Sequence, residues 1–571
     1  MLILASLLIA APPTSLIENG NFRHPWAEKW IGSQKGRATL DVRQSQADDH
    51  GASLTITTQE QANPWDSQLG QTVQKPIARG DVIYFQAWMR SPTRNKVFFI
   101  FEETDPPNSK SISESATLVP EWKEYKFAAK AIQGYVPGKS QAKFFFGQST
   151  GTIEISDVRV ENHGQIDPKS LSQTRDFWGG QAHDDSWKAA AFARIEKIRK
   201  GDFTIRVVDG SGKPVANAAV KVNQQRHAFR FGTAAAASRI LGNSPDDIKY
   251  KDILAKNFNT VVFENDLKWM ENSDRLAQAK AAMPWLKEHG FEVRGHNLVW
   301  GSFRWLPKRI EPMTVDETWS AIQDHVKEYV NGVKGDVYVW DVVNEAVSET
   351  GLWDKIGWNR FADTYKLAHS LDSKVELAYN DYNISNTSQV GFKHQADAIA
   401  RAQYLKDHGA PVNVFGDQGH MGTPFTPIPK VMKAWDNIDK LGLPIEITEF
   451  DLNVDDDSSH SAYATDVLIA AFSHPSIQSF VMWGFWEGSH WLPKGAMYRR
   501  DWSARPAADQ WHDWIYNKWW TRANLKSGRD GRTTSRGFYG DYSVEVTAGN
   551  KVVKKSFRLE PNSKHEIVIK I

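Results

Sequence analysis

The pattern of hydrophobic and polar positions divides the chain into regions of different character. From residue 16 to 162, short runs that alternate apolar and polar residues, such as SLTIT (53 to 57), are separated by clusters of Gly, Pro, Asn and Ser. Successive side chains of a strand point to opposite faces of a sheet, so these runs predict short strands with one buried face. Many such strands in succession predict a β-sandwich of the jelly-roll type over residues 16–162.

Alternating runs return at two places that lie far apart in the sequence. One is FTIRVVDGSGKPVANAAVKVNQ, in which DGSGKP predicts the turn of a hairpin, and the other is the C-terminal stretch that starts at YSVEV. Because the two have the same strand pattern, we predict that residues 201–228 and 529–571 pair into one small β-sandwich. Residues 163–200 are expected to form a linker and then a helix that Gly201 ends.

Between residues 229 and 528, apolar runs of strand length alternate with amphipathic helical stretches. The runs begin near residues 229, 260, 292, 337, 375, 413, 444 and 478. Eight strand-then-helix units predict an α/β fold of the (β/α)8, or TIM-barrel, type rather than an open doubly wound sheet. Neither GxGxxG nor GxxxxGK[ST] follows any of the runs, which removes the main support for a dinucleotide or nucleoside triphosphate site.

Composition and charge narrow the function classes. The 571 residues include 69 Lys+Arg and 68 Asp+Glu, a formal charge of +1 that creates no overall field to attract nucleic acid or an anionic membrane. The absence of cysteine excludes disulfides, thiolate metal sites and cysteine nucleophiles. The 24 Trp residues are an unusual number, which indicates either heavy use in cores or a ligand with flat apolar faces, such as a sugar.

The N-terminus indicates export. Residues 1–15 contain the apolar run LILASLLIAA followed by two prolines, which is too short to span a bilayer and lacks the positive charge that usually starts a signal peptide. We expect a signal peptide here, a secreted or periplasmic protein, and no membrane span.

Polar residues stand at the expected carboxyl ends of the barrel strands, where the loops of such a barrel form its active site. They are Glu264, Asn265, His296, Asn344, Glu345, Asp381, Gln418, His420, Glu449 and Asp451. A buried carboxylate is costly unless it is paired, so structural need does not explain so many polar residues at equivalent places. We interpret the group as an active site.

Two of these carboxylates predict acid/base and nucleophilic chemistry on an acetal. Glu345 ends the fourth strand and Glu449 the seventh, and across a barrel mouth their carboxyl groups can approach to about 5 to 5.5 Å, the separation found in retaining glycosidases. His420 is placed to bridge Asp451 and Glu449 and to keep Glu449 ionised. Glu345, near that negative charge, is then expected to have a raised pKa and to donate the proton.

The segments FNTVVFENDLKW, VRGHNLVW, WDVVNEAV, GDQGH, LPIEITEFDL and MWGFWEGSHW together resemble the ordered signature of glycoside hydrolase family 10, the retaining endo-β-1,4-xylanases. The resemblance covers the whole barrel. It implies two-step hydrolysis of internal xylosidic bonds of xylan, with Glu449 as nucleophile and Glu345 as acid/base. It also implies that Asn344, His420 and Asp451 support catalysis. The implied substrate contacts are Glu264, Asn265, Lys268, His296, Trp300, Gln418, Tyr382, Trp483 and Trp491.

The sequence departs from the family pattern at outer positions. Gly301 stands where many members have His, and Glu487, His490 and Leu492 surround the second Trp of the pair where many members have Asp, Ser and Arg. These departures leave both glutamates in place. They leave open the outer subsites and the tolerance for decorated xylan.

The N-terminal region carries a second resemblance. ENGNF, NPWDSQLGQ and GTIEISDVRVEN are similar to carbohydrate-binding modules grouped with families 4, 9 and 22. This implies a sugar cleft lined by Trp26, Trp65 and Gln68. The alternative, that these three are core or rim residues, is equally open.

Other functions stay open. The same chemistry on another β-1,4-glycan or a short oligosaccharide is one, and a non-catalytic polysaccharide-binding barrel is another. A metal-dependent hydrolase that uses His296 and His420 is a third, but the first strand lacks the usual tight His-x-His. We expect a monomer that acts on xylan or a related β-1,4-linked polysaccharide, with no metal, no cofactor and no nucleic-acid partner.

Overall fold

The chain forms two compact units, Met1–Ala182 and His183–Ile571. The apolar run of the expected signal peptide lies outside the described residues. Within the part that is described, no helix is both long enough and apolar enough to cross a membrane. The computed structural model describes residues 13–36, 40–48, 51–93, 95–179, 183–271, 274–387, 391–561 and 565–571.

The first unit is an antiparallel β-sandwich, as the alternating pattern predicts. One sheet has the order β3-β4-β11-β6-β9 with β1 beside β11, and the other has the order β2-β5-β10-β7-β8. Leu54, Phe85 and Phe144 are among the fully buried side chains of its core. The strands are β1 (Thr14–Ser15), β2 (Ile31–Gln34), β3 (Asp41–Asp48), β4 (Gly51–Thr58), β5 (Ser67–Val73), β6 (Val82–Arg90), β7 (Lys96–Glu103), β8 (Lys110–Thr117), β9 (Lys123–Lys130), β10 (Ser140–Phe145) and β11 (Gly151–Asn162). Three short 3-10 helices accompany them, η1 (Trp26–Glu28), η2 (Pro64–Asp66) and η3 (Pro168–Ser170).

Part of the expected linker is hydrogen-bonded to this sandwich. The Thr174 N–H donates to the Lys126 carbonyl at 2.7 Å, and the Lys126 N–H donates to Thr174 Oγ1 at 2.8 Å. Tyr84 of β6 donates its hydroxyl to the Ser172 carbonyl. The expected linker is therefore not wholly free: the part around Thr174 lies along the edge strand β9.

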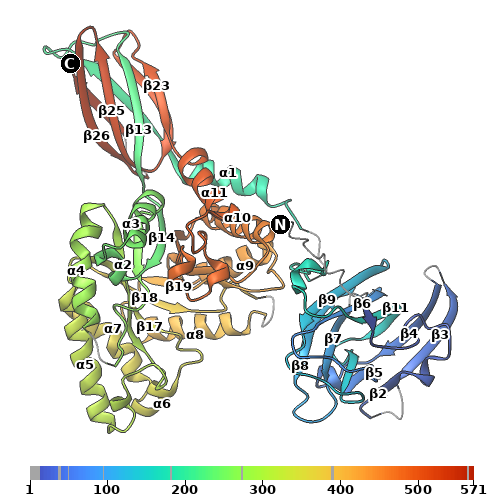
Figure 1. Cartoon of the computed structure of the whole chain (residues 1–571). Helices are drawn as coiled ribbons and strands as arrows, with labels where there is room; N and C mark the ends of the chain where they lie inside the picture. Colours follow the sequence, from blue (N-terminus) through green and yellow to red (C-terminus); the bar gives the residue numbers. More distant parts are fainter. Residues whose placement is uncertain are drawn as a thin grey trace, which may run out of the picture. The chain divides into compact units, whose positions relative to one another are not determined.

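In the second unit, eight parallel strands close into a barrel (Figure 1). The pairing runs from β14 through β19 to β21 and β22, and β22 pairs back with β14. Each strand coincides with one of the eight apolar runs, so the predicted (β/α)8 class is confirmed. The barrel strands are β14 (Arg230–Ala235), β15 (Thr260–Phe263), β16 (Glu292–Trp300), β17 (Val337–Asn344), β18 (Glu376–Asp381), β19 (Val414–Asp417), β21 (Ile445–Leu452) and β22 (Ile477–Met482). A two-residue strand, β20 (His420–Met421), pairs with β21.

Helices surround the barrel in Figure 1. In α5, the buried Ile322, Val326 and Tyr329 recur every three or four residues, which gives the helix one apolar face. Its first turn is closed by a capping box between Thr314 and Glu317. The helices are α2 (Ala237–Leu241), α3 (Pro245–Asn257), α4 (Arg275–Glu288), α5 (Val315–Gly332), α6 (Gly351–Ile356), α7 (Asn359–Leu371), α8 (Lys393–Asp407), α9 (Ile428–Asp439), α10 (Asp457–Ser473) and α11 (Pro506–His512). Shorter turns are η4 (Lys308–Ile310), η5 (Glu487–Ser489), η6 (Pro493–Gly495) and the π-helix η7 (Asp513–Lys518).

The small β-sandwich is built from segments on either side of the barrel in sequence, as predicted. A three-stranded sheet, β24-β12-β27, and a four-stranded sheet, β23-β13-β25-β26, share one apolar core. The strands are β12 (Lys200–Val208), β13 (Ala219–His227), β23 (Arg522–Lys526), β24 (Arg532–Phe538), β25 (Gly540–Ala548), β26 (Lys551–Leu559) and β27 (His565–Lys570).

Three details differ from the sequence prediction. β23 pairs with β13, so the small sandwich takes in residues that the pattern assigns to the barrel. Gly201 does not end the helix α1 (Lys188–Ile198), because it already lies in β12 and pairs with Gly537. The DGSGKP turn does form, with a bridge between Val208 and Pro214, but the chain then crosses to the other sheet. β12 and β13 are therefore not partners in a hairpin.

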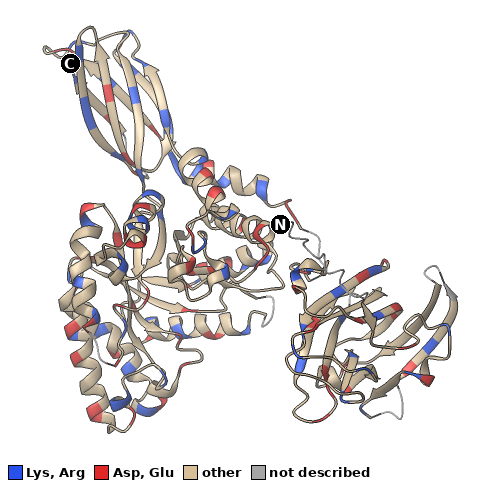
Figure 2. Ribbon diagram, viewed as in Figure 1, with Lys and Arg blue, Asp and Glu red and all other residues tan. Residues whose placement is uncertain are grey.

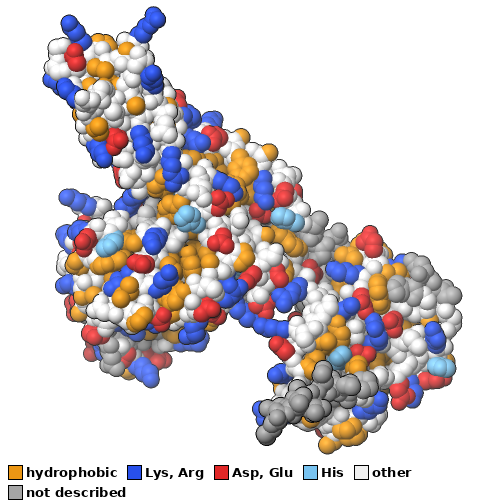
Figure 3. Space-filling view, turned by 45° about the horizontal axis from the view of Figure 1, so that its top comes forward, with side chains coloured by type: hydrophobic (Ala, Val, Ile, Leu, Met, Phe, Trp, Pro, Cys, Tyr) orange, Lys and Arg blue, Asp and Glu red, His pale blue; other side chains and the backbone are white. Residues whose placement is uncertain are grey.

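Charged residues of both signs are interspersed along the elements of each unit (Figure 2). On the face shown in Figure 3, neither sign covers a large continuous area. This distribution agrees with the formal charge of +1.

Candidate active site

One cavity of about 510 Å³ collects the predicted barrel residues. It lies at the carboxyl ends of the strands, where the chain leaves β15, β16, β17, β18, β19, β21 and β22. Two of the predicted barrel residues, Asp381 and Asp451, do not line it. The predicted residues that do are Glu264, Asn265, Lys268, His296, Trp300, Asn344, Glu345, Tyr382, Gln418, His420, Glu449, Trp483 and Trp491.

The backbone at the strand ends positions the two glutamates. Glu345 follows the last residue of β17 in a left-handed conformation, with φ of 58°, and its N–H donates to the Asn380 carbonyl at 2.9 Å. Backbone strain of this kind is found preferentially at functional sites. Glu449 lies where the register between β21 and β22 shifts, and its N–H donates to the Gln418 carbonyl at 2.8 Å. The irregularity of the strand helps to place the carboxylate in the cavity.

Glu449 is a buried carboxylate held ionised by its neighbours. Asn380 Nδ2 donates to its Oε1 at 2.8 Å, and His420 Nε2 lies 3.3 Å from its Oε2. Burial alone would raise the pKa of Glu449, but His296, His420 and Lys268 together lower it below the ordinary value. Asp451, 3.0 Å from His420 Nδ1, together with Glu449 raises the pKa of His420 to about 10 despite burial. The imidazolium stays charged at neutral pH, so Glu449 remains an anion there.

Glu345 is shifted in the opposite direction. Burial raises its pKa to about 7, and the charges of Glu449 and Asp381 act in the same direction. A hydrogen bond from Gln418 Nε2 to Glu345 Oε1, 2.9 Å long, opposes the shift. Trp300 Nε1 donates to the other oxygen at 3.0 Å. Near neutral pH this carboxyl group can therefore carry a proton that the carboxyl of Glu449 does not.

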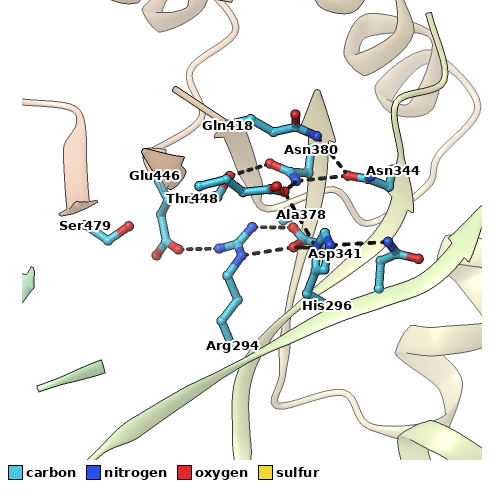
Figure 4. A network of polar contacts seen from close by, with 12 residues as sticks. Arg294, His296, Asp341, Asn344, Ala378, Asn380, Gln418, Glu446, Thr448 and Ser479 are labelled. Atoms are coloured by element: carbon cyan, nitrogen blue, oxygen red, sulfur yellow. Dashed lines mark hydrogen bonds and ion pairs between the residues drawn. The ribbon is translucent and has the colours of Figure 1, made fainter. Parts of the chain in front are cut away.

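Three side-chain amides, those of Asn344, Asn380 and Gln418, are hydrogen-bonded to one another (Figure 4) and connect the two glutamates. Asn380 donates both to Glu449 and, at 2.9 Å, to Asn344 Oδ1. Gln418 donates to Glu345 and, at 3.4 Å, to the same Asn344 oxygen. The Asn344 oxygen thus accepts from both amides, and Asn344 itself lines the cavity.

Indole rings form much of the remaining wall. Trp300 and Trp305 stack with ring centres 5.1 Å apart, and Lys268 Nζ lies 5.4 Å from the Trp300 ring. Trp491 is 54% exposed, and its Nε1 donates to Asp451 Oδ2 at 2.8 Å. Trp483 meets His296 edge to face at 5.1 Å. Broad indole faces next to carboxylates are suited to the apolar faces of pyranose rings.

Some residues of the site were not predicted from the sequence. At the end of β18 the strand pattern selects Asp381, but Asp381 is buried against His394, 2.9 Å away, and does not line the cavity. The neighbouring Asn380 contacts Glu449 instead, because successive strand residues point in opposite directions. Arg304, Trp305 and Glu349 also line the cavity, and they lie on loops that carry no periodic signal.

The three candidates in the N-terminal module are placed differently. Trp65 is 54% exposed on η2. Gln68 lies in β5 beside Phe145 of β10, and its Oε1 is buried without a hydrogen bond from any described residue. Trp26 packs against the sandwich core. The structure therefore leaves Trp65 and Gln68 as the candidates for a sugar surface and places Trp26 with the core.

Among the described residues, one group of side chains could hold a metal ion by proximity. Ligand atoms of His183, Asp185 and Asp466 lie within 4.8 Å of one another. The Lys188 ammonium group lies 2.7 Å from both carboxylates and already neutralises them. We assign no metal to this group, and none of its members lines the cavity.

The sequence model of glycosyl hydrolase family 10 matches residues 220–513, just over half of the chain. The chain belongs to glycosyl hydrolase family 10. The match begins in β13 of the small sandwich and includes every barrel strand. The site described above is therefore the family 10 cleft of this chain.

The curated proteins that are similar to this chain include an anti-sigma factor and xylanases. Anti-sigma-I factor RsgI6 of Acetivibrio thermocellus is 31% identical over 64% of this chain and 47% of its own length. Endo-1,4-beta-xylanase 1 of Arabidopsis thaliana is 28% identical over 66% of this chain and 39% of its own length. The chain thus spans less than half the length of these relatives. Xylanase 10B of Thermotoga petrophila in complex with xylobiose is a solved structure with 26% identity, covering 51% of this chain and 95% of that chain with a TM-score of 0.46.

The ionisation of Glu345 gives the first prediction. In protein carrying 13C-labelled glutamate carboxyls, one carboxyl should titrate near pH 7, and this titration should vanish in Glu345→Gln. Gln418→Ala should move the midpoint upward, because it removes a donor that stabilises the ionised form. Glu349→Gln, in the same cavity, serves as the control and should leave the midpoint in place. A Glu345 midpoint near 4.5 in the unmodified protein would contradict this assignment.

Proposed function

We propose that the chain is a retaining endo-β-1,4-xylanase. The observation that carries the proposal is the pair of glutamates in one cavity with opposite ionisation, Glu449 held as an anion and Glu345 with a pKa of about 7. Paired carboxyl groups with separated pKa values supply a nucleophile and a proton donor at the same pH.

The proposed reaction takes two displacements. In the first, a Glu449 carboxylate oxygen forms a bond to the anomeric carbon while the glycosidic bond breaks and Glu345 gives its proton to the leaving oxygen. In the second, Glu345 takes a proton from water, the water oxygen attacks the anomeric carbon, and the bond to Glu449 breaks. Both carboxyl groups return to their starting states, so no cofactor is needed.

The surrounding side chains have roles consistent with this proposal. The Asn344 side chain accepts from the two amides that contact the glutamates, and its amide nitrogen is suited to donate to the 2-hydroxyl of the sugar at the cleaved bond. Lys268, Glu264 and Asn265 form a polar wall for further hydroxyls. The indoles of the cavity wall are suited to stack on the sugar rings.

The choice of xylan rests on relatives and on charge. Relatives from Arabidopsis thaliana are named endo-1,4-beta-xylanases, and one from Dictyoglomus thermophilum, 32% identical over 36% of this chain, is named beta-1,4-xylanase. The near-zero net charge suits a neutral polysaccharide. The same site chemistry also suits another β-1,4-glycan, and comparison of initial rates on xylan, arabinoxylan and mixed-linkage glucan separates these substrates.

A second candidate function is polysaccharide binding without hydrolysis. The observation in its favour is that a relative with 31% identity is named an anti-sigma factor rather than a hydrolase. Family membership alone does not decide between the two. The intact pair of glutamates with separated pKa values favours hydrolysis, and the following experiments test it directly.

Replacing the proposed nucleophile gives the second prediction. Glu449→Gln should reduce xylan hydrolysis by about a thousandfold or more, because the amide cannot form the covalent intermediate. Circular dichroism and the melting temperature should show that the variant is folded. With the unmodified enzyme, proton NMR should detect the β-anomer of the product first, as retention requires. Early appearance of the α-anomer, or substantial hydrolysis by Glu449→Gln, would contradict the mechanism.

Replacing the proposed acid/base gives the third prediction. Glu345→Ala should lose about 10²- to 10⁴-fold in rate on xylan, whose leaving group needs a proton, and much less on activated aryl xylobiosides. In the unmodified enzyme, kcat/KM should fall as the pH rises past about 7, since the acid must be protonated, and this limb should be absent in the variant. Glu349→Gln should behave as the unmodified enzyme. Equal losses on both substrate types would remove Glu345 from this role.

We also propose that the N-terminal module binds the same polysaccharide. Trp65 offers an exposed indole, and Gln68, three residues away, has a buried oxygen without a partner among the described residues. Phe145 and Phe98 continue the same face of the sheet across β10 and β7. An exposed aromatic ring beside an amide is a common basis for sugar recognition.

The module gives the fourth prediction. The full chain carrying Glu449→Gln should be retarded in native gels that contain xylan, and addition of Trp65→Ala should remove part of that retardation. Ile132→Ala, which changes another exposed apolar residue of the same unit, provides the matched control. If Trp65→Ala migrates as the control does, then Trp65 takes no part in binding.

A further inference from the structure

A buried ion network fills the barrel beneath the cavity. Arg294 of β16, Asp341 of β17 and Glu446 of β21 are all fully buried. Arg294 Nε donates to Asp341 Oδ2 at 3.1 Å, a second guanidinium nitrogen donates to Asp341 Oδ1, and the third donates to Glu446 Oε2. Figure 4 shows the guanidinium group between the two carboxylates.

This arrangement is not required for a stable barrel. Buried ion pairs repay their desolvation cost poorly, and well-packed apolar residues of similar volume are often as stable or more so. The proposed reaction, moreover, uses none of the three residues. Stability alone therefore does not explain the network. Its contacts toward the cavity indicate a role in the active site.

The network reaches the nucleophile through one histidine. Asp341 Oδ2, which accepts from Arg294, also lies 2.9 Å from His296 Nδ1. The same His296 nitrogen lies 3.8 Å from Glu449 Oε1. A single carboxylate thus links the buried guanidinium to the imidazole that faces the nucleophile.

We infer that Arg294 is a positioning residue for the reaction: it fixes the Asp341 carboxylate, which in turn holds the His296 ring against Glu449. The inference rests on the proposed function, because it concerns the nucleophile of that reaction. Arg294 itself touches no substrate, since it lies wholly below the cavity and does not line it.

The charges around Asp341 support a chain of contacts in which Arg294 acts on Asp341 and Asp341 acts on His296. Burial would raise the pKa of Asp341, but Arg294 and then His296 lower it below its ordinary value. Among the described residues, Arg294 is the only Lys or Arg paired with Asp341. Without it, a fully buried carboxyl group would bind a proton and would lose most of its strength as an acceptor for His296.

Glu446 has other partners. Arg230 Nη1 lies 3.3 Å from its Oε1, and the Tyr338 hydroxyl donates to its Oε2 at 2.9 Å. Removal of Arg294 therefore leaves Glu446 partly paired but leaves Asp341 with His296 alone. Because the two carboxylates differ in this way, variants of Arg294 and of Glu446 can separate the effect on Asp341 and His296 from a general change in buried charge.

Other titratable groups face the network, and they stay the same in every variant described next. Below the network they are Arg230, Glu292, Tyr338, Tyr365 and Glu376, and around Glu449 they are Glu264, Lys268, Glu345 and His420. A shift in the pH profile that appears only when Arg294 is changed is therefore assigned to Arg294.

The test compares Arg294→Met/Glu446→Leu, Arg294→Lys and Glu446→Gln in the full chain. The double variant replaces Arg294 and Glu446 with apolar residues of similar size but leaves Asp341 buried without a cationic partner, so we expect a folded protein with a melting temperature below that of the unmodified chain. Circular dichroism at the assay temperature should show that it is folded. Its kcat on xylan should fall about tenfold or more with a smaller change in KM. The acid limb of kcat/KM should move upward by about one pH unit, because His296 no longer lowers the pKa of Glu449 fully.

The other two variants separate charge from packing. Arg294→Lys keeps a cation beside Asp341, so its acid limb should lie between those of the double variant and the unmodified enzyme. Glu446→Gln keeps the contact between Arg294 and Asp341, so it should leave the acid limb within about 0.3 pH unit of the original. Either a folded double variant with the original acid limb, or an equal shift in Glu446→Gln, would overturn the inference.

A second measurement keeps the inference independent of the proposed function. In protein with 15N-labelled histidine, the proton on His296 Nδ1 should give a downfield resonance, as expected for a hydrogen bond to a carboxylate. We expect this resonance to be lost in the double variant and kept in Glu446→Gln. If the unmodified chain hydrolyses no glycan, the proposed function fails, while this resonance still decides whether Arg294 positions His296. A resonance that persists in the double variant would refute the positioning role.

Discussion

An anionic carboxylate inside a barrel is stable only when donors on several strands meet around it. Glu449 satisfies this condition with Asn380 from β18, His420 from β20, His296 from β16 and Lys268 from the loop after β15. These residues are far apart in the sequence, and the closed ring of parallel strands brings their ends together. The barrel is thus the means by which a buried charge is compensated, and the proposed chemistry depends on that charge.

The same interior produces opposite protonation at two glutamates a short distance apart. Burial penalises the anion at both Glu345 and Glu449. Glu449 faces the cationic His420 and its partner Asp451, whereas Glu345 receives its hydrogen bonds from the neutral Gln418 and Trp300. The difference between the proposed nucleophile and the proposed acid therefore comes from the charge of the neighbours rather than from the depth of burial. Because Gln418 and Asn380 share Asn344 as a partner, the two environments are also joined geometrically.

Sequence patterns predict what depends on a repeated local signal. The eight apolar runs predicted the barrel strands, and most of the polar residues at their ends line the cavity. The patterns do not predict features that depend on which residues or strands pack together in the folded chain. Strand chemistry does not tell which sheet β13 joins, and a run of two polar residues does not tell whether Asn380 or Asp381 turns inward. The role of Arg294 could not be predicted for the same reason. A lone charged residue within an apolar run does not indicate that two carboxylates contact it from β17 and β21.

The Trp residues include some that fill cores and some that line the cavity. Trp30, Trp340, Trp353 and Trp435 are fully buried and serve as packing. Trp300 and Trp491 instead present a face to the cavity while their Nε1 atoms are bonded to Glu345 and to Asp451. Each indole is thereby attached to one member of the proposed acid/base machinery, Trp300 to the proposed proton donor and Trp491 to the carboxylate that contacts His420. In the proposed reaction, a sugar ring that stacks on either indole would fix the ring whose nitrogen is bonded to that carboxylate, so the same contacts would set binding along the cleft and the geometry of proton transfer.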